Sequence, residues 1–144
     1  MKKILVIQLC RIGDILMTGP LLRGLRREHP SAELSLMVMD SFAATPLPPH
    51  LYDRLVVFPI GDLAITLAKK EAGWEPALDE LRRFLKGLGT TPFDLVVNLT
   101  HTDMSALVTS LVPARKRVGL VSRADRRKGI DSPWMTYLRA TASG

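Results

Sequence analysis

The sequence has one cysteine, few aromatic side chains and no long apolar run. Cys10 cannot form an internal disulfide, and a lone thiol with no cysteine or histidine beside it does not indicate a metal site. This cysteine usage fits a reducing, cytoplasmic setting best. No apolar stretch approaches the roughly 18 residues that a membrane-spanning helix requires. We therefore expect a protein that does not cross a membrane.

The 144 residues are 47% hydrophobic and 24% charged, which is ordinary for a globular protein, and their number suits one domain. The net charge of +6 suggests an anionic partner without saying which one. Most of the excess lies within residues 115–144, which carry many arginines and lysines against Asp125 and Asp131. Two interpretations stay open for this segment, a solvated basic face and an anion-binding surface.

Apolar runs alternate with helical patterns, which predicts an α/β fold, a Rossmann-like parallel sheet with helices on both faces. Residues 1–10 open with lysines and a short apolar run but lack the small residues of a cleavage site, so we interpret them as a strand and not as a leader. The expected strands are residues 3–9, 33–39, 54–58, 93–99 and 118–121. The expected helices are residues 14–28, with a kink at Pro20, and residues 76–87 and 102–111.

Ligands of such sheets bind at the carboxyl ends of the strands, so the loops that follow the strands are the places to look for chemistry. These loops are residues 10–14, 40–42, 59–62 and 98–103. The first has one glycine where a dinucleotide-binding loop has three, in the spacing Gly-x-Gly-x-x-Gly. This argues against an oxidoreductase.

Gly13 and Asp14 stand at the first strand-to-helix turn. Glycine allows a sharp turn and a close approach by a ligand, because it has no Cβ. The residues alone favour Asp14 as a cap of the following helix, over a catalytic role. In the loop after the fourth strand, we expect Thr100 to cap the helix with Asp103 three residues on, and His101 stays open between a general base, a hydrogen-bond donor and a surface residue.

Several short motifs resemble the ADP-heptose:lipopolysaccharide heptosyltransferase family, glycosyltransferase family 9. They are ILVI at residues 4–7, RIGD at 11–14, Pro20, Leu25, PSA at 30–32, FDLVVN at 93–98, SALV at 105–108 and RKRVG at 115–119. Residues 40–90 match only in general layout. The resemblance implies that residues 1–144 are the N-terminal, acceptor-side domain of a GT-B glycosyltransferase. The C-terminal nucleotide-sugar domain is then absent, so we expect a piece of a longer protein or of a split gene product, inactive alone.

The resemblance also implies an inverting transfer of heptose from ADP-heptose to the Kdo and heptose inner core of lipopolysaccharide. Asp14 would be the general base, and it can also cap its helix. The residues expected to bind the acceptor are Arg11, Gly13, Thr100, His101, Thr102, Arg123 and Arg126, with Lys69 and Lys70 as weaker candidates. No metal or other cofactor is expected, since the co-substrate ADP-heptose would occupy the missing domain. The location would be cytoplasmic, in peripheral contact with the inner membrane surface.

Two other classes of function remain. One is a non-catalytic α/β binding module for an anionic ligand. The other is nucleic-acid binding, which the charge alone suggests, although no known motif and few aromatic residues accompany the basic ones. The resemblance favours the glycosyltransferase and no nucleic-acid partner.

Overall fold

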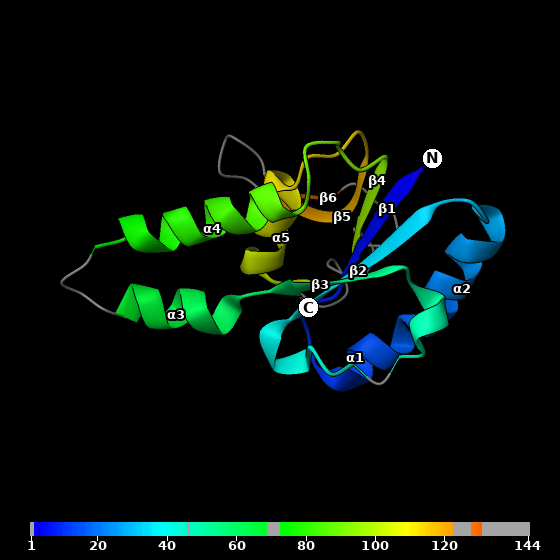
Figure 1. Ribbon diagram of the computed structural model, residues 1–144, viewed down its shortest axis with the longest axis horizontal. Helices are drawn as coiled ribbons and strands as arrows, with labels where there is room; N and C mark the ends of the chain where they lie inside the picture. The colour runs from blue at the N-terminus through cyan, green and yellow to red at the C-terminus, as the bar shows by residue number, and fades with distance from the viewer. Residues whose placement is uncertain (1, 46, 69–72, 123–127, 131–144) are drawn as a thin grey trace, which may run out of the picture.

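The computed structural model describes residues 2–45, 47–68, 73–122 and 128–130, which form a six-stranded sheet with helices on both faces (Figure 1). The strands lie in the order β3-β2-β1-β4-β5-β6, with β6 antiparallel to β5 and the other neighbours parallel. Their bounds are β1 Lys3–Ile7, β2 Glu33–Met39, β3 Arg54–Phe58, β4 Leu95–Asn98, β5 Arg117–Ser122 and β6 Lys128–Ile130.

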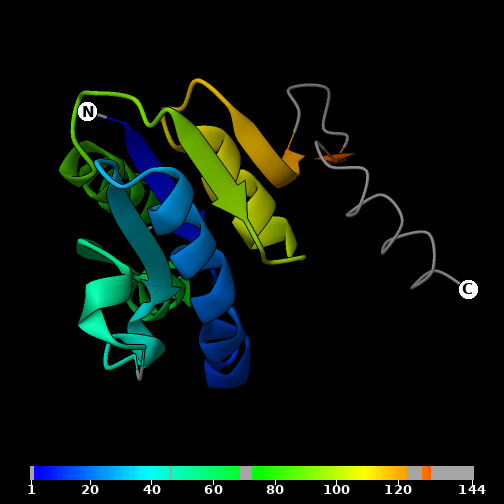
Figure 2. The same cartoon turned by 90° about the vertical axis from the view of Figure 1, so that its right-hand side faces the viewer.

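Within the described ranges, five α-helices and two short 3-10 turns accompany these strands. The helices are α1 Ile12–Met17, α2 Gly19–Glu28, α3 Ile60–Ala68, α4 Glu75–Gly87 and α5 Asp103–Leu111, and the turns are η1 Asp40–Phe42 and η2 Pro49–Leu51. Helices α1 and α2 pack on one face of the sheet, and α3, α4 and α5 pack on the other. In Figure 2, α1 and α2 (blue) pass in front of the strands and α5 (yellow) lies behind β4.

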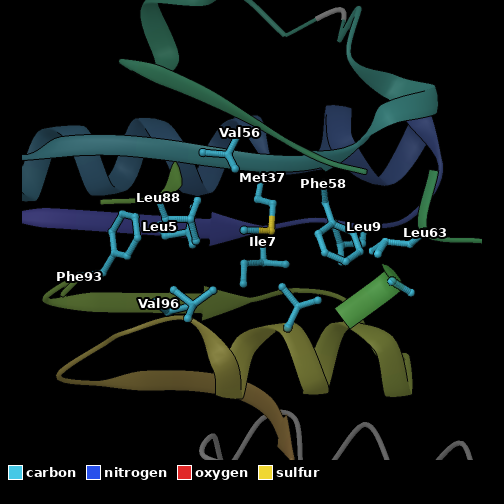
Figure 3. Packing of buried hydrophobic residues seen from close by; sticks show 13 residues of the cluster. Leu5, Ile7, Leu9, Met37, Val56, Phe58, Leu63, Leu88, Phe93 and Val96 are labelled. Atoms are coloured by element: carbon cyan, nitrogen blue, oxygen red, sulfur yellow. The ribbon is translucent and has the colours of Figure 1, made fainter. Parts of the chain in front are cut away.

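The alternation of side chains along β1 divides the core between the two faces. Leu5 and Ile7 point toward α3, α4 and α5, where they join Met37, Phe58 and Val96 in the larger cluster (Figure 3). Ile4 and Val6 point to the opposite face, where Val6 packs in the cluster that contains Ile15 and Leu22 of α1 and α2. Residues 4–7 are fully buried, as expected for a central strand that is covered on both sides.

The predicted α/β sheet is confirmed, with β2 and β3 at their expected bounds. The expected kink is also present, because the helical segment divides at Thr18 and Pro20 falls in the first turn of α2, where its missing amide costs no helical hydrogen bond. The antiparallel strand β6 was not predicted. Its three residues lie in a charged stretch whose pattern carries no alternation.

An ion pair joins α2 to the start of β3. Arg26 Nη2 lies 2.7 Å from Asp53 Oδ2, and the same carboxylate oxygen accepts the Leu34 amide at 2.8 Å. The hydrogen bond from Arg26, and then that from Leu34, lower the pKa of Asp53 below its ordinary value of 3.8. Asp53 therefore ties a helix and two strands together at the end of the sheet opposite the predicted site.

Candidate active site

The order of the strands changes direction between β1 and β4. From β1 the chain builds outward through β2 to β3, and it then crosses back to place β4 and β5 on the other side of β1. In open parallel sheets, the binding crevice lies outside the carboxyl ends of the strands at such a switch point. Of the four loops considered above, those that follow β1 and β4 therefore flank the candidate active site.

Asp14 lies exposed in the first turn of α1, which follows β1. Arg11 occupies the N-cap position in an extended conformation, and no side chain caps the helix. The interpretation of Asp14 as the cap is therefore wrong, because the helix begins two residues earlier than the sequence suggested. Within the described part of the chain, the Asp14 carboxylate has no hydrogen-bond partner. A carboxylate so placed is free to accept a proton from a bound ligand.

The backbone around Asp14 is well anchored. Its amide donates to the Arg11 carbonyl at 3.0 Å, and its carbonyl accepts the Thr18 hydroxyl at 3.0 Å. Ile15, the next residue, is fully buried against the core. These backbone hydrogen bonds and the burial of Ile15 fix the orientation of α1 and, with it, the position of Asp14.

Gly13 differs from its predicted role in the turn. It lies inside α1 rather than before it, and it is not among the described glycines with positive φ, which are Gly73, Gly89 and Gly119. Extended Arg11 makes the change of direction instead. A Cβ at position 13 would meet no atom within 4 Å, so the surface above Gly13 is open to a ligand.

The loop after β4 corrects a second prediction. Thr102, not Thr100, is the N-cap of α5, and its hydroxyl accepts the Ser105 amide at 3.2 Å. The capping-box spacing from Thr100 to Asp103 predicted the wrong N-cap, because Asp103 is already the first residue of the helix. Thr100 is instead fully buried, and its hydroxyl hydrogen bonds to residues 8 and 9 at the end of β1.

Buried polar side chains join the ends of β1, β4 and β5. Asn98 Nδ2 donates to the Leu120 carbonyl at 2.8 Å and to Ser105 Oγ at 3.2 Å, and Asn98 Oδ1 accepts the Thr100 amide at 2.9 Å. The Thr100 hydroxyl donates in turn to Gln8 Oε1 at 3.0 Å. Every one of these groups has a partner, so the network is rigid and holds the two loops of the site in fixed register.

The remaining predicted site residues divide into two sets. Arg11, His101 and Thr102 are exposed on the two loops. Arg123, Arg126, Lys69 and Lys70 lie outside the described residues.

Two residues that hold the loops at this edge of the sheet were not singled out from the sequence. Gln8 is polar at the end of an apolar strand, and this break in the pattern was the available signal. Asp40 follows β2, and its carboxylate accepts the Ser41 amide at 2.8 Å and the Gly61 amide at 2.7 Å. It fixes the loops after β2 and β3 to each other, as Thr100 fixes those after β1 and β4.

No family model matches the chain. Among curated proteins it is similar to lipopolysaccharide heptosyltransferase 3 of Escherichia coli (strain K12), with 26% identity over 126 residues that cover 88% of this chain and 34% of the relative. The resemblance to the heptosyltransferase family is confirmed. The chain spans about a third of the length of this relative.

Solved heptosyltransferases share the fold. The structure of E. coli heptosyltransferase WaaC with ADP-2-deoxy-2-fluoro heptose superposes with a TM-score of 0.64 at 23% identity, over 81% of this chain and 36% of that one. A glycosyl transferase family 9 protein of Veillonella parvula gives 0.60 at 21% identity, over 83% and 32%. E. coli ADP-heptose lps heptosyltransferase II gives 0.56 at 23%, over 83% and 30%. The Rossmann-like fold class that the sequence pattern predicted is thereby confirmed.

The described residues contain neither a candidate metal cluster nor a candidate membrane-spanning helix. No three histidine, cysteine, aspartate or glutamate side chains gather there in a way that would hold a metal ion. Across the same residues, every helix is too short or too polar to pass through a bilayer.

Proposed function

We propose that this chain is the N-terminal, acceptor-side domain of an inverting GT-B glycosyltransferase. The reaction would transfer heptose from ADP-heptose to the Kdo and heptose inner core of lipopolysaccharide. The observation that carries the proposal is the exposed Asp14 carboxylate at the switch point of the sheet, which has no hydrogen-bond partner among the described residues, in a chain that resembles heptosyltransferases.

Asp14 would act as the general base. As the acceptor hydroxyl oxygen attacks the anomeric carbon of the heptose, its proton passes to the Asp14 carboxylate and ADP leaves from the opposite face with the bonding electron pair. The hydroxyl becomes strongly acidic only as the new bond forms, which allows a carboxylate to take its proton. No metal ion or other cofactor enters this proposal, and EDTA should leave the rate unchanged.

The acceptor is rich in carboxylates and phosphates, which suits exposed cations and hydrogen-bond donors. Arg11, His101 and Thr102 are exposed on the two loops of the site, and the open surface above Gly13 leaves room for a sugar. Arg123 and Arg126 would add forked guanidinium donors. Because lipopolysaccharide is anchored in lipid, the protein would work in the cytoplasm in peripheral contact with the inner membrane surface.

The donor would occupy a second Rossmann-like domain, which supplies the rest of the active site. The 34% coverage of the curated relative supports this division. Residues 1–144 should therefore show little affinity for ADP in a calorimetric titration. Micromolar binding of ADP to this chain would overturn its assignment to the acceptor side.

The decisive assay gives the complete gene product ADP-heptose and a Kdo-containing acceptor, and measures ADP release and sugar transfer. Transfer that inverts the anomeric configuration is expected. If the protein binds the anionic acceptor and transfers no sugar, the alternative of a non-catalytic binding module replaces the enzyme.

A further inference from the structure

We infer that Thr100 is a positioning residue, whose hydroxyl sets the location of the turn that carries Asp14. The inference rests on the proposed function, because it assumes that Asp14 does chemistry. Thr100 is fully buried and does not reach the surface of the site, so its contribution passes through the residues at the end of β1.

The contact is made by one oxygen atom that both donates and accepts. Thr100 Oγ1 accepts the Leu9 amide at 2.8 Å and donates to Gln8 Oε1 at 3.0 Å. Leu9 and Gln8 are themselves buried, at 6% exposure each, so water does not compete for these bonds. A hydroxyl is the group suited to this position, since it alone among small side chains offers a donor and an acceptor at one atom.

This hydroxyl holds the chain at a critical point. The ladder between β1 and β4 is continued by the Leu99 amide, which donates to the Ile7 carbonyl at 3.0 Å. Along the described chain, the next backbone amide after that of Leu9 to donate a hydrogen bond is that of Asp14. It donates to the Arg11 carbonyl and begins the helical bonds of α1. Cys10 and Arg11 thus span the gap between the Thr100 anchor and the helix.

Thr100 is itself held firmly enough to act as a reference point. Its amide donates to Asn98 Oδ1 at 2.9 Å, and its carbonyl accepts the Ser105 hydroxyl at 3.0 Å. Asn98 is fixed to β5 through the Leu120 carbonyl. Thr100 therefore positions the turn after β1 relative to β4, β5 and α5.

The test compares Thr100→Val, which keeps the branched shape and removes the hydroxyl, with Thr100→Ser, which keeps the hydroxyl. Thr109→Val is the matched control. Thr109 is also a fully buried threonine, but its hydroxyl donates to the Ser105 carbonyl within α5 and makes no contact with the end of β1. All three variants change a buried threonine, but only Thr100→Val removes the hydroxyl that contacts the end of β1. The comparison therefore separates a loss of stability from a loss of position.

Two readouts are needed. Hydrogen exchange of residues 1–144 should show the Leu9 amide and α1 exchanging at least ~10-fold faster in Thr100→Val and near the parent rate in Thr100→Ser and Thr109→Val. In the complete gene product, Thr100→Val should lower kcat by about 10- to 100-fold with the acceptor KM changed by less than about twofold, since a small displacement of a catalytic group is costly. Serine should restore most of kcat.

The outcomes separate this inference from the function on which it rests. If Asp14→Asn abolishes transfer while Thr100→Val leaves kcat unchanged, the positioning role is overturned and the enzyme stands. If Thr109→Val lowers kcat as much as Thr100→Val, the effect is one of general stability and the inference is again overturned. If Asp14→Asn has no effect on transfer, the proposed function itself fails, whatever the exchange data show.

Discussion

Gly119 of β5 approaches Asn98 of β4 so closely that a Cβ at position 119 would overlap the Asn98 carbonyl oxygen. Its φ of +105° also falls in the region that side chains disfavour. The two residues are register partners in the sheet, and the Asn98 side chain accepts the Thr100 amide. The close contact therefore lies directly beneath the loop that follows β4.

Gly119→Ala should be strongly destabilising, because both the backbone conformation and the space forbid a methyl group. We expect a loss of about 2–4 kcal/mol in the free energy of unfolding, measured by urea denaturation. Gly24→Ala is the control, since Gly24 lies within α2 and a Cβ there meets no atom within 4 Å. It should raise stability by about 0.5–1 kcal/mol. Equal effects at the two positions would contradict the packing described for β4 and β5.

Thr102 caps α5, and its removal should weaken the start of that helix. Thr102→Ala is expected to lower the free energy of unfolding by about 1 kcal/mol, since the Ser105 amide loses its side-chain acceptor. Thr102→Ser should retain most of the stability. An alanine variant as stable as the parent would show that the cap is not formed in solution.

The ion pair between Arg26 and Asp53 should make stability depend on pH in the acid range. The folded protein lowers the pKa of Asp53 below 3.8, so its stabilisation is present above that value and is lost as the pH falls through the lower folded pKa. Asp53→Asn should thus be less stable than the parent at pH 7, by no more than about 1 kcal/mol because the pair is partly exposed.

The difference between Asp53→Asn and the parent should shrink as urea denaturation is repeated from pH 5 toward pH 2.5. Asp79→Asn removes the exposed pair with Arg82 within α4 and serves as the control, with a change under about 0.5 kcal/mol. A difference at Asp53 that stays constant down to pH 2.5 would contradict the assignment.

Hydrophobic patterning predicted most of the sheet, because buried parallel strands such as residues 33–39 read as continuous apolar runs. The kink predicted at Pro20 corresponds to the division of the helical segment at Thr18, since Pro20 cannot donate its amide. Helix α3 was not among the expected helices, because its exposed side is largely apolar: Ile65 and Leu67 are 60% and 55% exposed. Apolar side chains on the exposed side of a helix obscure its hydrophobic period.

The site was harder to predict than the fold. The strand-to-helix connection after β1 was predicted, but Gly13 and Asp14 lie inside α1 and not in the turn, because the helix begins at Ile12 and extended Arg11 makes the turn. The cap of α5 was assigned to Thr100 and not to Thr102, since both stand near the helix start and only their depth below the surface tells them apart. The hydrogen bond between the side chains of Thr100 and Gln8 joins segments that are distant in sequence, so local spacing of residues could not predict it.

The central claim is that the Asp14 carboxylate takes the proton of the acceptor hydroxyl. Asp62→Asn is a matched control, because Asp62 is likewise an exposed aspartate in the first turn of a helix that follows a parallel strand, α3 after β3. Both variants should unfold at the urea concentration of the parent within about 0.5 kcal/mol, as expected for exposed positions.

The most direct measurement is the rate of heptose transfer from ADP-heptose by the complete gene product carrying Asp14→Asn or Asp62→Asn. We predict that Asp14→Asn lowers kcat by at least about 100-fold, with the acceptor KM little changed, and that Asp62→Asn transfers at the parent rate. Near-normal turnover by Asp14→Asn would contradict the account, because the base would then lie elsewhere.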